Sequence, residues 1–223
     1  MPSKHIVHAS QLYIDKRDSL CALPLINPTA IVLDPIEYGM GFQRGEMNEF
    51  VGSDANKITL QRDMAEAFDN NKWSLVPEQQ HLEYLVQLWY DNLHCPVDER
   101  ARYIPLKKGL RVSKSGRTFY PYSLYRLDSF PIYTVDGTLT QSGATRVWSS
   151  IPPYIWLVAA SIFLHGQYLH VPGHLCSQKW RLRVVYDMAR CPMPRTFIDR
   201  LPQPQRPTPY VREVEDAQAQ DVP

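Results

Sequence analysis

The sequence predicts an α+β fold, with short strands and helices alternating inside one domain. Three observations support this prediction. The stretch from Asp54 to Pro77 carries the signals of a strand, a helix and a second strand in succession. The stretch from Ile151 to Leu164 is apolar on nearly every side and predicts one long buried helix. Thirteen tyrosines and 19 prolines favour irregular, aromatic-lined segments over a helical bundle.

The stretch from Asp54 to Pro77 is the most regular part of the chain. Residues 57–60 are expected to be extended, and a helix of about two to three turns follows them. The apolar side chains that share one face of this helix are Leu60, Met64, Ala67 and Phe68. Residues 69–71, Asp-Asn-Asn, tolerate turn conformations and end the helix. Residues 73–76 then predict a strand, which Pro77 closes.

Shorter elements are expected on both sides of this stretch. Apolar runs predict strands at residues 5–9, 20–23, 29–33 and 132–135. Residues 36–52 are rich in glycine and methionine and have no regular period, so we expect a loop with one short helix there. Residues 114–117, Lys-Ser-Gly-Arg, predict a turn at the tip of a hairpin.

Residues 81–89 fit two kinds of element. The larger side chains alternate with polar ones along this segment; they are Leu82, Tyr84, Val86 and Leu88. This alternation favours a strand with one buried face. A helix is the alternative.

The C-terminal half is dominated by the apolar helix, which we expect at residues 150–169. A serine can cap its first turn, and Pro152 and Pro153 fit there because the first N–H groups of a helix have no partner within the helix. One more element is expected at residues 180–188. We expect a single domain over residues 1–201, followed by a Pro-rich, acidic tail at residues 202–223.

Composition and charge restrict the function. A formal net charge of +1 gives no overall field that would attract nucleic acid or a membrane. The apolar stretch is shorter than the about 20 residues of a membrane-spanning helix, and residues 1–11 lack the apolar core of a signal peptide. The four cysteines form no C-x-x-C pair, so no zinc site is expected. We therefore expect a cytoplasmic protein with neither a metal nor a cofactor.

Three motifs follow one another in the first part of the chain. They are R-D-S-L-C-A-L-P from Arg17, T-A-I-V-L-D-P from Thr29, and N-K-I-T-L-Q-R-D-M-A-E-A-F-D from Asn56. This order resembles the HNH endonuclease domains that are common in fungi, and the third motif is the most specific part of the match. The resemblance implies a ββα-metal core over residues 1–90. It also implies an extension over residues 91–201, which contains a hairpin and the long buried helix.

Both histidines of the HNH pattern are replaced in this chain. The resemblance places the histidine that activates water at Ala30 and the last metal-binding histidine at Ala65, while Asn56 keeps the middle position. Such a nuclease needs a divalent cation at the leaving oxygen and a base that deprotonates water. An alanine side chain supplies neither. The resemblance therefore implies a degenerate, pseudo-nuclease core that binds no metal.

A different site is expected between the predicted hairpin and the buried helix. If these two elements face one another, their aromatic and polar side chains line an apolar cleft, as in many small-molecule sites. The candidate catalytic residues are Tyr122, Asp128 and His165. The candidate substrate-binding residues are Tyr120, Tyr125, Trp148 and Trp156. Packing in the protein core is the alternative interpretation of these side chains.

Two functions remain compatible with the sequence. The first is a cofactor-independent cyclase or isomerase, similar to pericyclases, that acts on an apolar small molecule in fungal secondary metabolism. Such an enzyme folds a flexible substrate while a polar side chain polarises one carbonyl. The second is a catalytically inactive module that binds nucleic acid or a protein partner. It would use residues 100–126, which contain eight Lys or Arg and no Asp or Glu.

Overall fold

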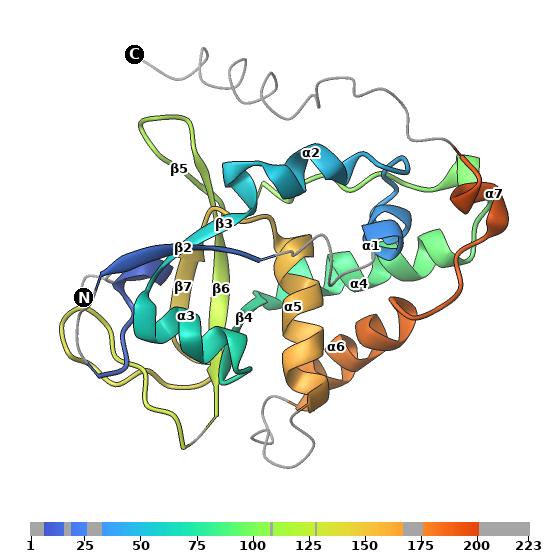
Figure 1. Cartoon of the computed structure of the whole chain (residues 1–223). Helices are drawn as coiled ribbons and strands as arrows, with labels where there is room; N and C mark the ends of the chain where they lie inside the picture. The colour runs from blue at the N-terminus through green and yellow to red at the C-terminus, as the bar shows by residue number, and fades with distance from the viewer. Residues whose placement is uncertain are drawn as a thin grey trace.

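The computed structural model describes residues 7–15, 19–25, 33–107, 109–127, 129–166 and 176–200. They form an α+β fold, as the sequence predicts. Figure 1 shows most strands on one side of the molecule and most helices on the other, with the long helix α5 (Pro153–Gly166) between them. The predicted tail, residues 202–223, lies outside the described residues.

A small antiparallel sheet and a short helix form one corner of the fold. The elements of this corner are β2 (Leu20–Pro24), β3 (Lys57–Gln61) and α3 (Arg62–Asp69), and the chain then continues into β4 (Trp73–Pro77), which belongs to the larger sheet. β2 pairs with β3, and α3 follows β3 directly. Asn71 has a φ of 52° and turns the chain out of the helix, which asparagine tolerates better than most residues. The strand, helix and strand predicted between Asp54 and Pro77 are therefore confirmed.

The larger sheet has five strands. They are β1 (Val7–His8), β4, β5 (Arg111–Val112), β6 (Thr118–Arg126) and β7 (Arg146–Ser149). The order is β1-β7-β6-β4, and β5 pairs with the first residues of β6. Pro121 lies in the gap between the β5 and β4 pairings, where its missing N–H leaves no hydrogen bond unmade on that edge. The predicted turn at residues 114–117 is confirmed, with Gly116 at a φ of 76°.

The described helices pack beside and behind this sheet. They are α1 (Leu33–Gly39), α2 (Met47–Gly52), α3, α4 (Gln79–Leu93), α5, α6 (Cys176–Met188) and α7 (Arg195–Ile198), with single 3₁₀ turns at Ala9–Gln11, Asp54–Asn56 and Val97–Glu99. α5 packs against β4 and α6. Among the described residues, none of the helices is both long enough and apolar enough to cross a membrane.

The structure corrects four local predictions. Residues 81–89 belong to the helix α4 and not to a strand, because the residues that α4 buries follow a helical period; they are His81, Leu82, Leu85, Leu88, Trp89 and Asn92. Residues 36–52 contribute to two helices, α1 and α2, where one was expected. Residues 132–135 form no strand but only isolated bridges from Tyr133 to Tyr13 and to Leu139, although the turn after them is present. Of the predicted strand at 29–33, the described Leu33 begins α1 and the rest lies outside the described residues.

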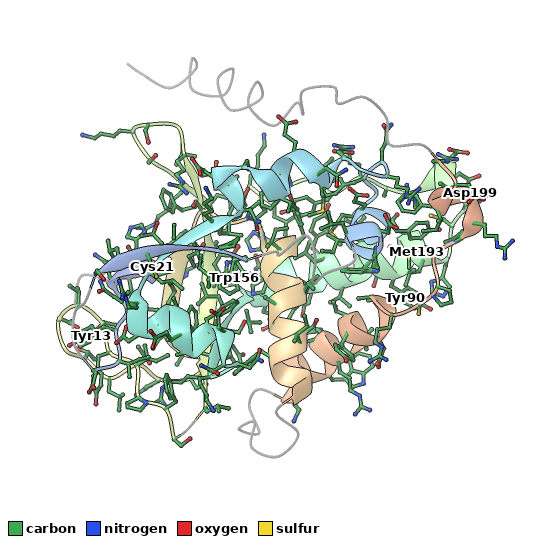
Figure 2. All side chains as sticks on the ribbon, in the orientation of Figure 1. Tyr13, Cys21, Tyr90, Trp156, Met193 and Asp199 are labelled. Carbon is green, nitrogen blue, oxygen red and sulfur yellow. The ribbon has the colours of Figure 1, made fainter. Side chains whose placement is uncertain are left out.

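An aromatic cluster joins the small corner to the larger sheet and to α5. Trp156 of α5 contacts Phe68 of α3, Trp73 of β4 and Tyr122 of β6, with ring centres 5.6, 6.1 and 6.1 Å away. The indole nitrogen of Trp73 donates a hydrogen bond of 2.9 Å to the carbonyl oxygen of Met64. Figure 2 shows Trp156 near the centre of the molecule, between α5 and the strands. These contacts make α5 part of one continuous core with the sheet.

A close approach of two backbone segments occurs at the end of α1. Gly41 has a φ of 67°, and a Cβ atom built on it would lie 2.1 Å from the carbonyl oxygen of Ala101. The N–H of Tyr103 donates a 2.9 Å hydrogen bond to the carbonyl oxygen of Met40. Only glycine permits both this backbone angle and this distance. The approach brings Tyr103 into the interior.

Replacement of Gly41 is expected to be strongly destabilising. Gly41→Ala adds a methyl group against a backbone carbonyl and imposes a left-handed conformation on alanine, so the free energy of unfolding should fall by at least about 2 kcal/mol. Gly52→Ala is the matched control, because no atom lies within 4 Å of its added Cβ. It should change stability by less than about 1 kcal/mol. Urea denaturation of both variants tests this, and equal effects would contradict it.

Candidate functional site

Four tyrosine side chains from three segments meet inside the protein. Tyr103 precedes β5, Tyr120 and Tyr122 lie on β6, and Tyr154 lies in the first turn of α5. Their exposed fractions are 4%, 2%, 0% and 6%, in the same order. The rings of Tyr103 and Tyr154 meet edge to face with their centres 5.2 Å apart. We call these four residues the phenol cluster.

Strand geometry places two of the four phenols on the face of β6 that looks toward α5. Side chains alternate between the two faces of a strand, so Tyr120 and Tyr122 point to the same side. Tyr122 lies opposite Val147 of β7, and its hydroxyl donates to the carbonyl oxygen of Ile151. The N–H of Ile151 donates in turn to the Ser149 hydroxyl at 3.2 Å. Tyr122 therefore fixes the connection from β7 into α5.

An apolar wall and a surface ion pair lie beside Tyr154. Its ring packs against Phe42 and Phe50, with ring centres 5.4 and 6.3 Å away. The guanidinium of Arg102 lies over Phe42, 5.2 Å from the ring centre. Arg102 also donates two hydrogen bonds to the carboxylate of Glu46. The outer side of the cluster is thus closed by aromatic carbon and then by this ion pair.

Burial keeps the phenol cluster uncharged. It is the main reason that the pKa values of Tyr103, Tyr122 and Tyr154 lie above the ordinary phenol value, and the neighbouring phenols raise these pKa values further. These side chains consequently stay protonated at physiological pH. They can donate hydrogen bonds to a neutral or developing negative oxygen, but they cannot act as ready bases.

One hydroxyl of the cluster stands apart from the others. The Tyr103 hydroxyl oxygen is buried and has no hydrogen-bond partner in the part of the chain that the structure describes. Leaving a buried hydroxyl unpaired costs about 1–3 kcal/mol, so such groups are uncommon in native proteins. The indole nitrogen of Trp156, which also borders Tyr122, is likewise without a partner among the described residues. Tyr103 in the cluster and Trp156 beside it therefore each offer a donor that the described fold does not use.

The predicted site residues that the structure describes do not all lie on one face of the larger sheet. Tyr120 and Tyr122 lie in the phenol cluster, and Trp156 contacts Tyr122. Tyr125 and Trp148 belong to the other face of the sheet, because they lie opposite Ser74 and Pro121 in the register. The seven predicted residues are Tyr120, Tyr122, Tyr125, Asp128, Trp148, Trp156 and His165. Tyr125 is buried there, which raises its pKa, and its hydroxyl also lacks a partner among the described residues.

Two of the predicted catalytic residues cannot be placed in the cluster. Asp128 lies outside the described residues. The backbone of His165 lies near the C-terminal end of α5, about 16 Å along the helix axis from Tyr154 at the helical rise per residue. The side chain of His165 lies outside the described part of the structure. The helix thus separates this position from the phenols.

Sequence reasoning missed Tyr103 and Tyr154. The position of Tyr103 depends on the backbone approach at Gly41, which leaves no local pattern in the sequence. The sequence could have predicted the position of Tyr154. This residue follows Pro152 and Pro153, which mark the first helical turn and hence the point where α5 leaves the sheet.

The positions of the HNH pattern have structural roles here. The side-chain nitrogen of Asn56 donates to the carbonyl oxygen of Val51 at 3.0 Å. The Asp63 carboxylate accepts hydrogen bonds from the N–H groups of Ile14 and Asp15, at 2.7 and 3.2 Å. Ala65 is buried on α3, and Ala30 lies outside the described residues. Within the described residues, no three His, Cys, Asp or Glu side chains are grouped so as to hold a metal ion.

Comparisons of the chain with protein-family models, with curated proteins and with solved structures find no significant match. The fold and the site therefore define the chain by class. It is an α+β protein with a buried, uncharged cluster of four phenols at the junction of β6, β7 and α5.

Two tyrosine-to-phenylalanine changes should have opposite effects on stability. Tyr122→Phe removes the donor to the buried Ile151 carbonyl, so the free energy of unfolding should fall by about 1–3 kcal/mol. Tyr103→Phe removes a buried hydroxyl that has no partner among the described residues, so stability should stay unchanged or rise by up to about 1 kcal/mol. Chemical denaturation measures both. A loss in Tyr103→Phe as large as that in Tyr122→Phe would show that the protein itself uses this hydroxyl.

Proposed function

We propose that this chain is a cofactor-independent cyclase or isomerase that acts on an apolar small molecule carrying a carbonyl or ether oxygen. One observation supports this proposal above all others. The Tyr103 hydroxyl is a buried donor with no partner among the described residues, and it belongs to a cluster of uncharged phenols. A ligand oxygen is a suitable acceptor for such a donor, because it completes the hydrogen bonding of a group already removed from water.

The proposed reaction requires the phenols only to donate hydrogen bonds to a substrate oxygen. In a cyclisation or isomerisation the product has the same atoms as the substrate, so the step requires no oxidant, reductant or second substrate. Electron density shifts toward the substrate oxygen as bonds rearrange, and a phenol already directed at that oxygen stabilises the shift. The raised pKa values keep the phenols as donors throughout. Aromatic walls such as Phe42 and Trp156 restrict a flexible substrate to reactive conformations.

The proposal assigns different roles within the cluster. Tyr103 donates directly to the substrate oxygen. Tyr122 is a positioning residue, because its hydroxyl already binds the Ile151 carbonyl and so holds the start of α5 in place. Tyr120 and Tyr154 complete the uncharged surroundings and raise the pKa of Tyr122. Asp128 and His165, two of the catalytic residues expected from the sequence, have no role in this proposal.

The scaffold in this proposal is an HNH-like core that has lost its nuclease site. Three features support this part of the proposal. The antiparallel pair of β2 and β3 is followed directly by α3, which is the order of a ββα unit. Asn56 and Asp63 hold backbone groups in place. Ala65 packs in the core. Reuse of this scaffold in fungal secondary metabolism remains part of the proposal, as the resemblance implies.

Gene disruption tests the reaction class without knowledge of the substrate. Loss of a cyclase or isomerase should remove one metabolite of the source organism and accumulate another of identical molecular formula, as seen by high-resolution mass spectrometry. The wild-type gene should restore the original compound, and Tyr103→Phe should restore little of it. Tyr90→Phe is the matched control, since Tyr90 is 51% exposed on α4. An accumulated compound of different formula, or an unchanged metabolite profile, would overturn the proposal.

A pair of matched probes tests the donor directly in the purified protein. 2-Acetylnaphthalene and 2-ethylnaphthalene have nearly the same shape, but only the first has a carbonyl oxygen. The wild-type protein should bind the ketone about tenfold more tightly, the value of roughly one buried hydrogen bond. Tyr103→Phe should abolish this preference, while Tyr90→Phe should keep it. Equal affinities for both probes in the wild-type protein would contradict the donor role, whatever the metabolite experiment shows.

A further inference from the structure

The cations of residues 100–126 divide into two groups. Three of them are committed to the fold or to an ion pair. The Arg100 guanidinium lies over the rings of Tyr38 and Phe197, 4.5 and 4.7 Å from their centres, and donates to backbone carbonyls of the segment around α1. Arg102 pairs with Glu46. Arg126 donates to the carbonyl oxygens of residues 127, 130 and 140. Their charges are therefore not available to a partner.

The other described cations of this segment lie on the surface. They are Lys107, Arg111, Lys114 and Arg117. All four are exposed, and none has an ion-pair partner in the described part of the chain. Three of them belong to the ribbon of β5 and β6, which Figure 1 shows extending from the sheet away from α4 and α6. We call Arg111, Lys114, Arg117 and Phe119 the cationic ribbon.

Aromatic rings support the guanidinium groups of Arg111 and Arg117, and also that of the neighbouring Arg146, which is ion-paired with Glu78. The central carbon of the Arg111 guanidinium lies 4.6 Å from the centre of the Trp148 ring, and that of Arg146 lies 5.1 Å from the same ring. The Arg117 guanidinium lies 6.0 Å from the centre of Phe119. Arginine loses less side-chain freedom on binding an anion when its planar group already rests on a ring. Arg111 and Arg117 are thus partly organised for anion binding.

The register of the ribbon brings cation and ring together on one face. Arg111 lies directly opposite Phe119 in the β5–β6 pairing, and paired residues point to the same side. Arg117 is two residues before Phe119, about 7 Å along an extended chain. His8 of β1 packs edge to face on Phe119 with ring centres 5.3 Å apart. The face therefore alternates positive charge with aromatic surface over a short distance.

We propose that the cationic ribbon binds single-stranded nucleic acid. Guanidinium groups neutralise phosphates, while a half-exposed ring such as Phe119 and flat guanidinium planes stack on unpaired bases. A duplex offers phosphates but hides its base faces, so the aromatic part of this surface favours a single strand. The inference does not depend on the phenol cluster, whose two β6 residues, Tyr120 and Tyr122, lie on the opposite face of that strand. It also uses no residue of β2, β3 or α3.

Fluorescence anisotropy with the full-length protein tests this inference. The probes are a labelled oligothymidylate of about 15 nucleotides and a duplex of the same length. The single strand should bind more tightly, and its affinity should fall as salt rises from about 50 to 200 mM. Arg111→Ala and Arg117→Ala should each weaken binding and reduce the salt slope by about 0.7. Phe119→Leu keeps an apolar side chain, so it should weaken binding about tenfold without changing the slope.

Arg62→Ala is the matched control, because Arg62 is exposed on α3 and carries the same charge. It should bind the oligothymidylate as the wild-type protein does, and thermal unfolding should show that all variants remain folded. An equal loss in Arg62→Ala would mean that binding follows overall charge and would overturn the proposal. Tighter binding to the duplex, an unaltered affinity in Phe119→Leu, or no binding to either probe would also overturn it.

Discussion

Trp156 is the residue through which the separate parts of this fold depend on one another. Its indole meets one ring from α3, one from β4 and one from β6. α3 and β4 follow one another in the chain, whereas β6 comes about 40 residues later, and the side chain of Trp156 is fully buried between the three elements. Large buried aromatic surfaces contribute strongly to stability and have preferred geometries. These ring contacts therefore set the position of α5 against the sheet. Because Tyr154 lies at the start of α5, the same contacts place its ring in the phenol cluster.

A second constraint brings Tyr103 to the same place from the other side. The side-chain amide of Asn92 on α4 donates to the carbonyl oxygens of Gly39 and Ala101, at 2.9 and 2.8 Å, and accepts from the N–H of Ala101 at 2.8 Å. One buried amide thus joins α1, α4 and the segment before β5, and all of its bonds are to backbone. The phenol cluster is consequently a product of long-range contacts. Tyr103 and Tyr154 would be far from each other and from the two β6 tyrosines in a partly folded chain.

These two constraints explain which features the sequence could predict. The turn at residues 114–117, the elements between Asp54 and Pro77 and the helix α5 depend on local patterns of glycine, proline and apolar residues, and they were predicted. The prediction of a strand at residues 81–89 was wrong because apolar and polar side chains alternate there at a few positions. The helical period of the buried residues is evident only over the whole of α4. Tyr120 and Tyr122 were found because they lie on an evident strand. Tyr103 could not be found, since a hydrogen-bonded amide and a glycine distant in sequence determine its position.

The two faces of β6 differ in their access to water at the beginning of the strand, although Tyr125 is buried further along the outer face. Tyr120 and Tyr122 face α5 and are buried, whereas Phe119 lies on the other face beside exposed arginines. A guanidinium on the inner face would lose its hydration without a partner, while a phenol there remains neutral. The Tyr122 hydrogen bond to Ile151 opposes any slip of the strand, because a shift by one residue would exchange the two faces. β6 can therefore contribute to both proposed sites, the buried phenol cluster on one face and the cationic ribbon on the other, provided that its register is held.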